Sequence, residues 1–203
     1  MKIPKMVLSL MSAVIWIHSA NAKTHEHHQG ATNKPAVAAA ADNLNDESIY
    51  NLNSELLDKD GKSVSLKMFR GQPVVISMAY TSCTYTCPLI VAQMQQIEKA
   101  LVEAGKTDVH FVLVSFDPKK DTPKVLSDFA AKKKLSERWS LLTSHSDKEP
   151  REIANLLGIK YKKVEGGDYD HSFVISVLDK EGVIRGKQVG AGGNPKDLIK
   201  FLP

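Results

Sequence analysis

The chain has 203 residues and a formal net charge of +4 at pH 7, enough for one domain with its own hydrophobic core plus extensions. Lys2 and Lys5 lie in a leading segment without acidic residues, which leaves 25 of the 27 basic residues against 23 acidic ones. A balance this small excludes a strongly basic surface, so no nucleic-acid partner is expected.

Residues 1–22 have the pattern of a secretory signal peptide. A positively charged start precedes the short apolar run Met6–Ile17, and Ala20-Asn21-Ala22 predicts cleavage after Ala22. The run is shorter than the roughly 20 apolar residues that cross a bilayer. The alternative is an uncleaved membrane anchor, and in both cases the remaining chain is expected in the periplasm or another extracytoplasmic space.

Residues 23–48 are predicted to be a His-rich start followed by a flexible tether without apolar periodicity. If the signal is cleaved as predicted, His25 becomes the third residue of the mature protein. Its imidazole, the free α-amine and two backbone amides then make a square-planar nitrogen set that suits Cu(II) or Ni(II). His27 and His28 add neighbouring imidazoles. The alternative is an ordinary solvated tail.

The folded domain is predicted at residues 49–203. Apolar runs and turn signals predict a hairpin at Leu56–Leu66, strands at Val74–Tyr80, Val109–Phe116, Trp139–Leu142, His171–Leu178 and Val183–Val189, and helices at Pro88–Val102, Pro123–Lys133, Asp147–Leu157 and Pro195–Leu202. Alternating strands and helices favour an α/β sheet with parallel crossovers, and the closing hairpin adds an antiparallel edge. This order predicts a thioredoxin-like fold with a central mixed sheet, flanking helices and an added N-terminal β-hairpin.

The two cysteines, Cys83 and Cys87, lie between the first central strand and its helix. The first turn of a helix offers unpaired N–H groups and a positive dipole end, which favour thiolate over thiol. Three intervening residues place the sulfurs about one helical turn apart, a spacing that suits a disulfide or two ligands of one metal ion. Open α/β sheets keep their sites at this end of the strands.

His171 is the candidate third ligand. It follows the polar segment Gly166–Asp170 and precedes a strongly apolar strand, so it is expected to point from a loop towards the cysteines. Two thiolates and one imidazole suit Cu(I) by softness and Cu(II) by the imidazole. The alternative is a surface histidine at a strand end.

Three segments together resemble the Sco/SenC family of exported thioredoxin-fold proteins. Tyr80–Pro88, with the sequence Tyr-Thr-Ser-Cys-Thr-Tyr-Thr-Cys-Pro, is similar to the family's CxxxCP loop. Ser115–Pro123 is similar to its D-P-x-x-D-T-P segment, and Asp170-His171-Ser172 to its D-H-S/T element. The resemblance implies copper binding through the two cysteines and the histidine. It also implies delivery of copper to the Cu(A) centre of cytochrome c oxidase, although some family members act mainly as thiol reductants.

The loop departs from the family pattern between the cysteines. Many members carry Pro-Asp there, whereas this chain has Thr84-Tyr85-Thr86 without a charge. The missing charge is expected to affect which client protein the loop docks on. The metal ligands themselves are unchanged. Tyr85 is interpreted either as a contact residue for a partner or as an ordinary loop aromatic.

Other polar and sulfur-bearing side chains are interpreted as structural or solvated. They are His110, His145, Asp117, Asp121, Met78, Met94 and the run Lys132–Lys134. No serine–histidine–aspartate arrangement, phosphate-binding loop or C-x₂-C zinc pair is present in the sequence.

The sequence supports two main functions and one weaker one. The first is a copper metallochaperone, which has no substrate turnover and whose partner is subunit II of cytochrome c oxidase or another copper protein. The second is a thiol–disulfide oxidoreductase that reduces cysteines of exported proteins with the dithiol Cys83 and Cys87, itself kept reduced by a thiol-reducing partner. Peroxide reduction by a cysteine of low pKa is a weaker third interpretation.

Overall fold

The central strand of the fold is β3, Val74–Ala79, and each of its six residues is buried. A strand covered on both faces needs a continuous apolar run, as the sequence predicts. The structure is a computed structural model that describes residues 44–202. The predicted signal peptide and most of the predicted tether, including His25, His27 and His28, lie outside the described residues.

A mixed sheet of seven strands is built around β3 in the order β2-β1-β5-β4-β3-β8-β9. The strands parallel to one another are β3, β4 (His110–Ser115) and β5 (Trp139–Thr143). The antiparallel strands are β8 (Val174–Leu178), β9 (Ile184–Val189), β1 (Leu56–Asp58) and β2 (Ser63–Val64). The predicted parallel centre and antiparallel edge are both present.

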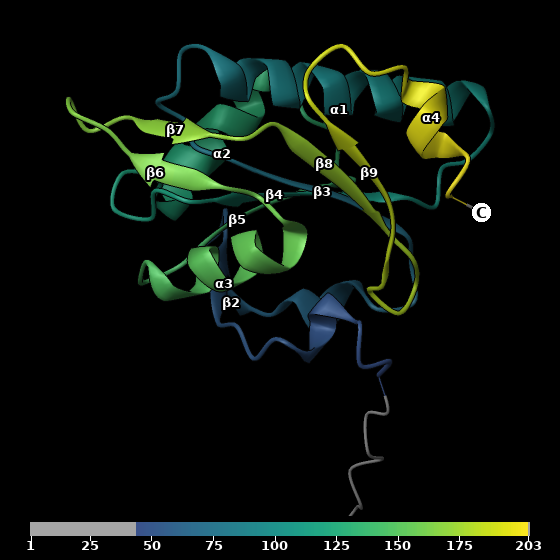
Figure 1. Cartoon of the computed structure of the whole chain (residues 1–203), viewed down its shortest axis with the longest axis horizontal. Coiled ribbons are helices and arrows are strands. Elements are labelled where there is room, and N and C mark those ends of the chain that lie inside the picture. The colour runs from purple at the N-terminus through teal and green to yellow at the C-terminus, as the bar shows by residue number, and fades with distance from the viewer. Residues whose placement is uncertain (1–43, 203) are drawn as a thin grey trace, which may run out of the picture. The chain divides into compact units, whose positions relative to one another are not determined.

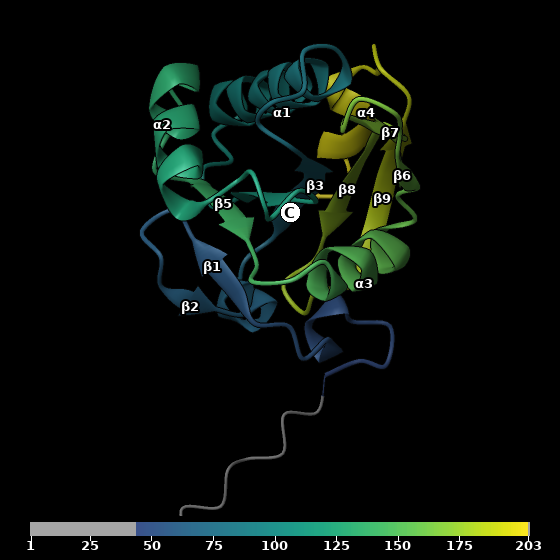
Figure 2. The same ribbon diagram turned by 90° about the vertical axis from the view of Figure 1, so that its left-hand side faces the viewer.

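Helices cover both faces of this sheet (Figure 1). They are α1 (Thr86–Glu103), α2 (Pro123–Lys133), α3 (Lys148–Leu157) and α4 (Pro195–Ile199). Figure 2 shows α1, α2 and α4 on one face and α3 on the other. This is the predicted thioredoxin-like fold. Within residues 44–202, no helix combines the length and the apolar character that a membrane crossing demands.

Local chemistry explains where the helices begin and end. The Thr122 hydroxyl accepts a hydrogen bond from the Val125 amide before α2, and the Asn194 side chain accepts one from the Lys196 amide before α4. Gly105 and Gly158 follow α1 and α3 with φ of +71°, a conformation that glycine adopts without strain. All four are residue types that commonly begin or end helices.

The predicted N-terminal hairpin is shorter than expected. Instead of running to Leu66, its second strand ends at Val64, because the Ser65 side chain accepts a hydrogen bond from the Lys67 amide and begins a 3₁₀ turn at Leu66–Phe69. β1 also pairs with β5, with Leu57 opposite Thr143. The hairpin is therefore one edge of the main sheet.

A second, small sheet was not predicted. β6 (Tyr161–Lys163) pairs antiparallel with β7 (Tyr169–His171). His171 therefore ends β7 and does not open the apolar strand, which is a correction of the predicted strand His171–Leu178. Ser172 and Phe173 separate the two strands: the Ser172 amide donates to the Lys160 carbonyl at 2.8 Å, and β8 begins at Val174.

Candidate metal centre

Cys83, Cys87 and His171 come together although they belong to three different segments. Cys83 lies in the loop after β3, Cys87 in the first turn of α1 and His171 at the end of β7. Their ligand atoms all lie within 4.8 Å of one another. Transition-metal ions such as zinc bind sulfur and nitrogen ligands at about 2.0–2.3 Å. Two ligand atoms on one such ion therefore lie about 4 Å apart. The spacing and the donor set therefore fit one soft metal ion.

Cys83 takes the place of a helix cap. Tyr85, the residue before α1, makes no side-chain capping bond, and the Cys87 amide donates to the Cys83 Sγ at 3.3 Å. Burial by itself raises the pKa of the Cys83 thiol, but hydrogen bonds from the amides of Cys87 and Tyr85 outweigh it, so the pKa lies below its usual value. Cys83 is half-buried and its thiol is free. It is therefore the more reactive of the two thiols.

Cys87 has a different environment. It is only 2% exposed, and its Sγ lies 3.4 Å from the Tyr80 amide. Burial raises the pKa of the Cys87 thiol, and the neighbouring Cys83 adds to the shift. In the reduced, metal-free protein Cys87 is therefore the thiol of the pair that loses its proton at the higher pH.

The hydrogen bonds of His171 fix its tautomer. Its Nδ1 lies 3.2 Å from the Ser172 carbonyl oxygen, and a carbonyl only accepts, so Nδ1 carries the hydrogen. Nε2 keeps its lone pair and lies 3.2 Å from the Cys87 Sγ. Burial lowers the pKa of the imidazole, so the ring is neutral at pH 7. A neutral imidazole whose free nitrogen faces the sulfurs is the form that binds a metal ion.

An aromatic cluster holds the histidine ring. The centre of the Phe116 ring lies 5.0 Å from the centre of the His171 ring and 5.0 Å from that of the Tyr161 ring. The centres of the Tyr80 and Phe116 rings are 5.1 Å apart. The Tyr169 amide donates to the Tyr80 hydroxyl at 3.3 Å, which ties β7 to the cysteine loop. Sequence reasoning missed this cluster. The sequence feature that could have indicated it is the repeated occurrence of aromatic residues at strand ends, close in sequence to the cysteine and histidine motifs.

Asp121 anchors the cysteine loop from α2's side. It is fully buried, accepts from the Thr81 amide at 3.0 Å and the Thr81 hydroxyl at 2.5 Å, and accepts from the Ser115 hydroxyl at 2.6 Å. Asp121 is therefore structural, as the sequence predicts, and its role extends to the cysteine loop. Asp121 connects the end of β4 to the loop that carries Cys83.

Several other candidates are structural or solvated, as predicted. His110 donates to or accepts from the Ser140 hydroxyl at 2.9 Å and packs against the Phe69 ring. Met78 and Met94 are buried in the core, and His145 is exposed. Tyr85 is 82% exposed, which leaves both of its interpretations open.

The lysines at the end of α2 are closer to the site than the sequence indicates. Lys132 and Lys133 line a hollow of about 320 Å³ that also includes Cys83 and Cys87. Lys133 lies over the Phe129 ring, with its Nζ 5.7 Å from the ring centre. The run Lys132–Lys134 ends α2, as the sequence predicts. Two of its members also place positive charge beside the cysteines.

The second predicted site, made by His25, His27 and His28, lies outside the described residues. It stays a prediction that depends on cleavage after Ala22.

Comparisons with known proteins agree with the motifs. The SCO1 protein homolog of Bacillus subtilis (strain 168) is 34% identical over 146 residues, which is 70% of this chain and 75% of the relative. A SCO1/SenC family lipoprotein from Bacillus anthracis str. Ames has a TM-score of 0.67 and 28% identity, and the match covers 72% of this chain and 89% of that one.

Two further solved structures bear on the site. Bradyrhizobium japonicum ScoI with copper bound has a TM-score of 0.61 and 25% identity, over 73% of this chain and 96% of that one. BsSco, described as having a disulfide switch and as a member of the Sco family of cytochrome c oxidase assembly proteins, has a TM-score of 0.62 and 30% identity, over 71% of this chain and 85% of that one. A family model described as SCO1/SenC matches residues 43–201, and the chain therefore belongs to the SCO1/SenC family.

Proposed function

We propose that this protein binds one copper ion through Cys83, Cys87 and His171 and transfers it to another copper protein. The observation that carries this proposal is the convergence of three ligand atoms within 4.8 Å. The tautomer of His171 supports it, because the lone pair of Nε2 faces the sulfurs. A related protein with the same fold, Bradyrhizobium japonicum ScoI, has been solved with copper bound. Copper is the cargo of this site, and three ligands leave it accessible to a fourth ligand from a partner.

The client that we propose is subunit II of cytochrome c oxidase, in the assembly of its Cu(A) centre. The description of BsSco as an oxidase assembly protein supports this choice. We also propose that residues 1–22 direct the chain to the periplasm with cleavage after Ala22, and that residues 49–203 form the copper-transfer domain. The lipoprotein from Bacillus anthracis supports an extracytoplasmic location.

A Cu(I) titration of the full chain against a competing chelator tests the site. All proteins in the comparison carry His25→Ala, His27→Ala and His28→Ala, so that the N-terminal histidines contribute nothing. The additional change His171→Ala should weaken Cu(I) binding by about 100-fold or more, because even changes to groups that only orient a ligand cost 10–100-fold. The matched control is His145→Ala, which removes an exposed imidazole and should leave the affinity unchanged. Equal affinities for all three proteins would contradict the proposal.

A second function, thiol–disulfide exchange, is favoured by the unequal thiols. Cys83 is the accessible thiol of lower pKa, and Cys87 is the buried thiol of higher pKa. This is the arrangement of an attacking and a resolving cysteine. An oxidoreductase should exchange with a model disulfide even when His171 is replaced by alanine, whereas copper transfer should then fail. Exchange rates and copper transfer measured on His171→Ala therefore separate the two functions.

A further inference from the structure

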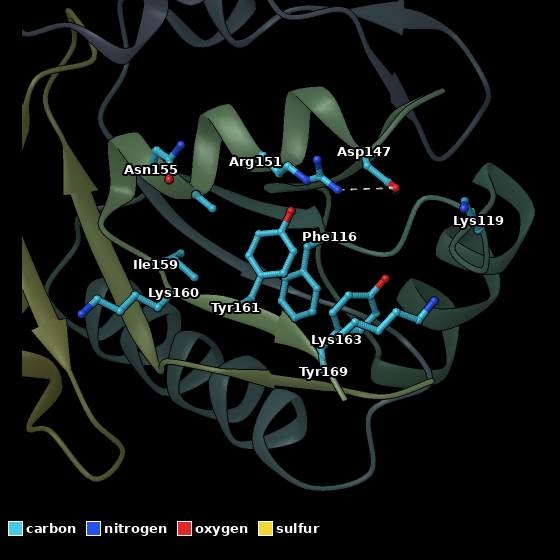
Figure 3. Close-up of a pocket in the computed structure, with 11 residues that line it drawn as sticks. Phe116, Lys119, Asp147, Arg151, Asn155, Ile159, Lys160, Tyr161, Lys163 and Tyr169 are labelled. Atoms are coloured by element: carbon cyan, nitrogen blue, oxygen red, sulfur yellow. Dashed lines mark ion pairs between the residues drawn. The ribbon is translucent and has the colours of Figure 1, made fainter. Parts of the chain in front are cut away.

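A second hollow lies beside the metal centre, between α3 and the β6–β7 hairpin (Figure 3). Its volume is about 580 Å³, within the range of ligand-binding pockets, about 300–1,000 Å³. Phe116, Tyr161 and Tyr169 contribute aromatic rings to its lining, and Ala154 and Ile159 contribute apolar groups. No ligand of the metal centre lines it, so it is a separate feature of the surface.

Positive charge surrounds this hollow. Lys119, Arg151, Lys160 and Lys163 line it, against a single acidic residue, Asp147. Asp147 lies 4.0 Å from the Arg151 guanidinium, while the Lys163 ammonium lies 5.8 Å from the centre of the Tyr169 ring. Among residues 44–202, the three lysines have no acidic side chain within ion-pair distance. The hollow therefore lacks the carboxylates that would balance its charge.

The hollow and the metal centre share their walls. The Phe116 ring stacks on the Tyr161 ring at 5.0 Å and lies 5.0 Å from the His171 ring. Tyr161 is also the register partner of His171 in the β6–β7 hairpin. A group that fills the hollow therefore contacts the same rings that hold the metal-binding imidazole. Occupancy of the hollow would bring a partner next to the bound copper.

We propose that this hollow docks an acidic segment of the protein that exchanges copper with the Cys83, Cys87 and His171 site. The inference rests on the proposed copper transfer and adds the chemistry of the partner. The four cations come from three separate segments, namely the loop after β4, α3 and β6 with its preceding residue. A small anion would neutralise one or two of them, whereas a segment with several carboxylates can reach all four. Charge complementarity of this kind sets the orientation and the rate of an encounter.

The test uses the full chain and a fluorescein-labelled pentapeptide of four glutamates around a central tyrosine. Fluorescence anisotropy in low-salt buffer should show binding that is lost when every glutamate of the peptide is replaced by glutamine. Lys160→Glu/Lys163→Glu should weaken binding by about tenfold or more, because like charges now face each other. The matched control is Lys62→Glu/Lys162→Glu, which makes the same charge change at exposed lysines that do not line the hollow. The control should bind the peptide within about twofold of the wild type, and thermal unfolding checks that both variants fold.

A Cu(I) titration of the same proteins separates this inference from the proposed function. Unchanged Cu(I) affinity together with weakened peptide binding in Lys160→Glu/Lys163→Glu supports the docking site. A wild-type protein that fails to bind Cu(I) overturns the proposed function, whatever the peptide does. Equal peptide binding by the two double variants overturns the docking site alone. Displacement of the peptide by acetate or benzoate, each of which carries one carboxylate, also overturns the docking site, because it would show that the hollow binds a single small anion.

Discussion

The two cysteines are chemically unlike although they are one helical turn apart. Cys83 is half-exposed and accepts a hydrogen bond from a first-turn amide of α1, whereas Cys87 is buried below the loop. A thiolate is stabilised by such amides and destabilised by burial. The asymmetry is therefore set by the place of each residue relative to the helix start, and it determines which sulfur meets a partner first.

Alkylation of the reduced, metal-free protein should show this asymmetry. We expect iodoacetamide at pH 7 to modify Cys83 about tenfold faster than Cys87, because the first thiol has the lower pKa and the greater exposure. Mass spectrometry after short reaction times measures both rates in one sample. Cys83→Ser should leave a protein that reacts slowly, and Cys87→Ser one that reacts fast. Equal rates at the two positions would show that the loop opens on the time scale of the reaction.

A second prediction at this scale concerns Asp121, which holds Thr81 and Ser115. Asp121→Ala leaves the Thr81 amide and two hydroxyls without their acceptor, which should cost about 2–3 kcal/mol of unfolding free energy. Cu(I) affinity should also fall, because the anchor of the loop before Cys83 is lost. The matched control is Asp128→Ala in α2, which breaks only an exposed ion pair with Lys124 and should change stability by less than about 1 kcal/mol. Urea unfolding and the Cu(I) titration read the two effects, and similar results for both variants would refute the anchoring role.

At the scale of elements, the order and type of most helices and strands could be predicted from the sequence. The buried runs of β3 and β4 are long enough for their apolar pattern to be decisive, and the caps at Thr122 and Asn194 follow from simple side-chain chemistry. The three-residue strands β6 and β7 could not be predicted, because so short a run carries no measurable period. Positive φ angles at Gly166 and Gly167 shape their turn, but the sequence indicates only a loop there.

The same limit applies to the site. Cys83, Cys87 and His171 could be named from their motifs, since each motif is local. The residues that hold these ligands in place, Phe116, Tyr161 and Asp121, could not be named in this way, because they act through contacts between different elements. The β6–β7 hairpin is the clearest case. Pairing of Tyr161 with His171 places the imidazole, yet neither strand is evident from its own residues.

Phe116→Leu tests whether the aromatic cluster supports the histidine. Loss of the ring should cost about 1–1.5 kcal/mol of unfolding free energy and should weaken Cu(I) binding, though less than His171→Ala does. The matched control is Phe111→Leu, which removes a fully buried ring of β4 that stacks on Trp139 at 5.1 Å. The control should lose comparable stability and keep its Cu(I) affinity. If both variants lose the same affinity, the effect comes from general loosening of the fold.

At the scale of the whole molecule, the segment before β1 is fastened to the far end of the chain. The Ile49 amide donates to the Gly182 carbonyl at 3.1 Å, and the Tyr50 side chain is fully buried. Gly182 lies in the turn between β8 and β9. Because β8 is antiparallel to β3, with Leu178 opposite Val74, this turn lies at the opposite end of the sheet from the cysteine loop. The contacts of Ile49 and Tyr50 with this turn therefore stabilise the fold at a distance from the metal centre.

Gly182→Ala tests the packing of the Tyr50 ring against Gly182, and Gly192→Ala is the matched control. Both glycines have a positive φ, +81° and +80°, so alanine brings a similar backbone cost of about 1–2 kcal/mol at each. A Cβ at Gly182 would lie 2.5 Å from the Tyr50 ring, whereas one at Gly192 meets nothing within 4 Å. Gly182→Ala should therefore lose about 1–3 kcal/mol more, the usual cost of overpacking. Urea unfolding of the full chain gives the difference, and the folded fraction of both variants should bind Cu(I) as the wild type does. Equal destabilisation would mean that the Tyr50 ring moves aside at no cost, and that its packing on Gly182 does not hold the segment before β1.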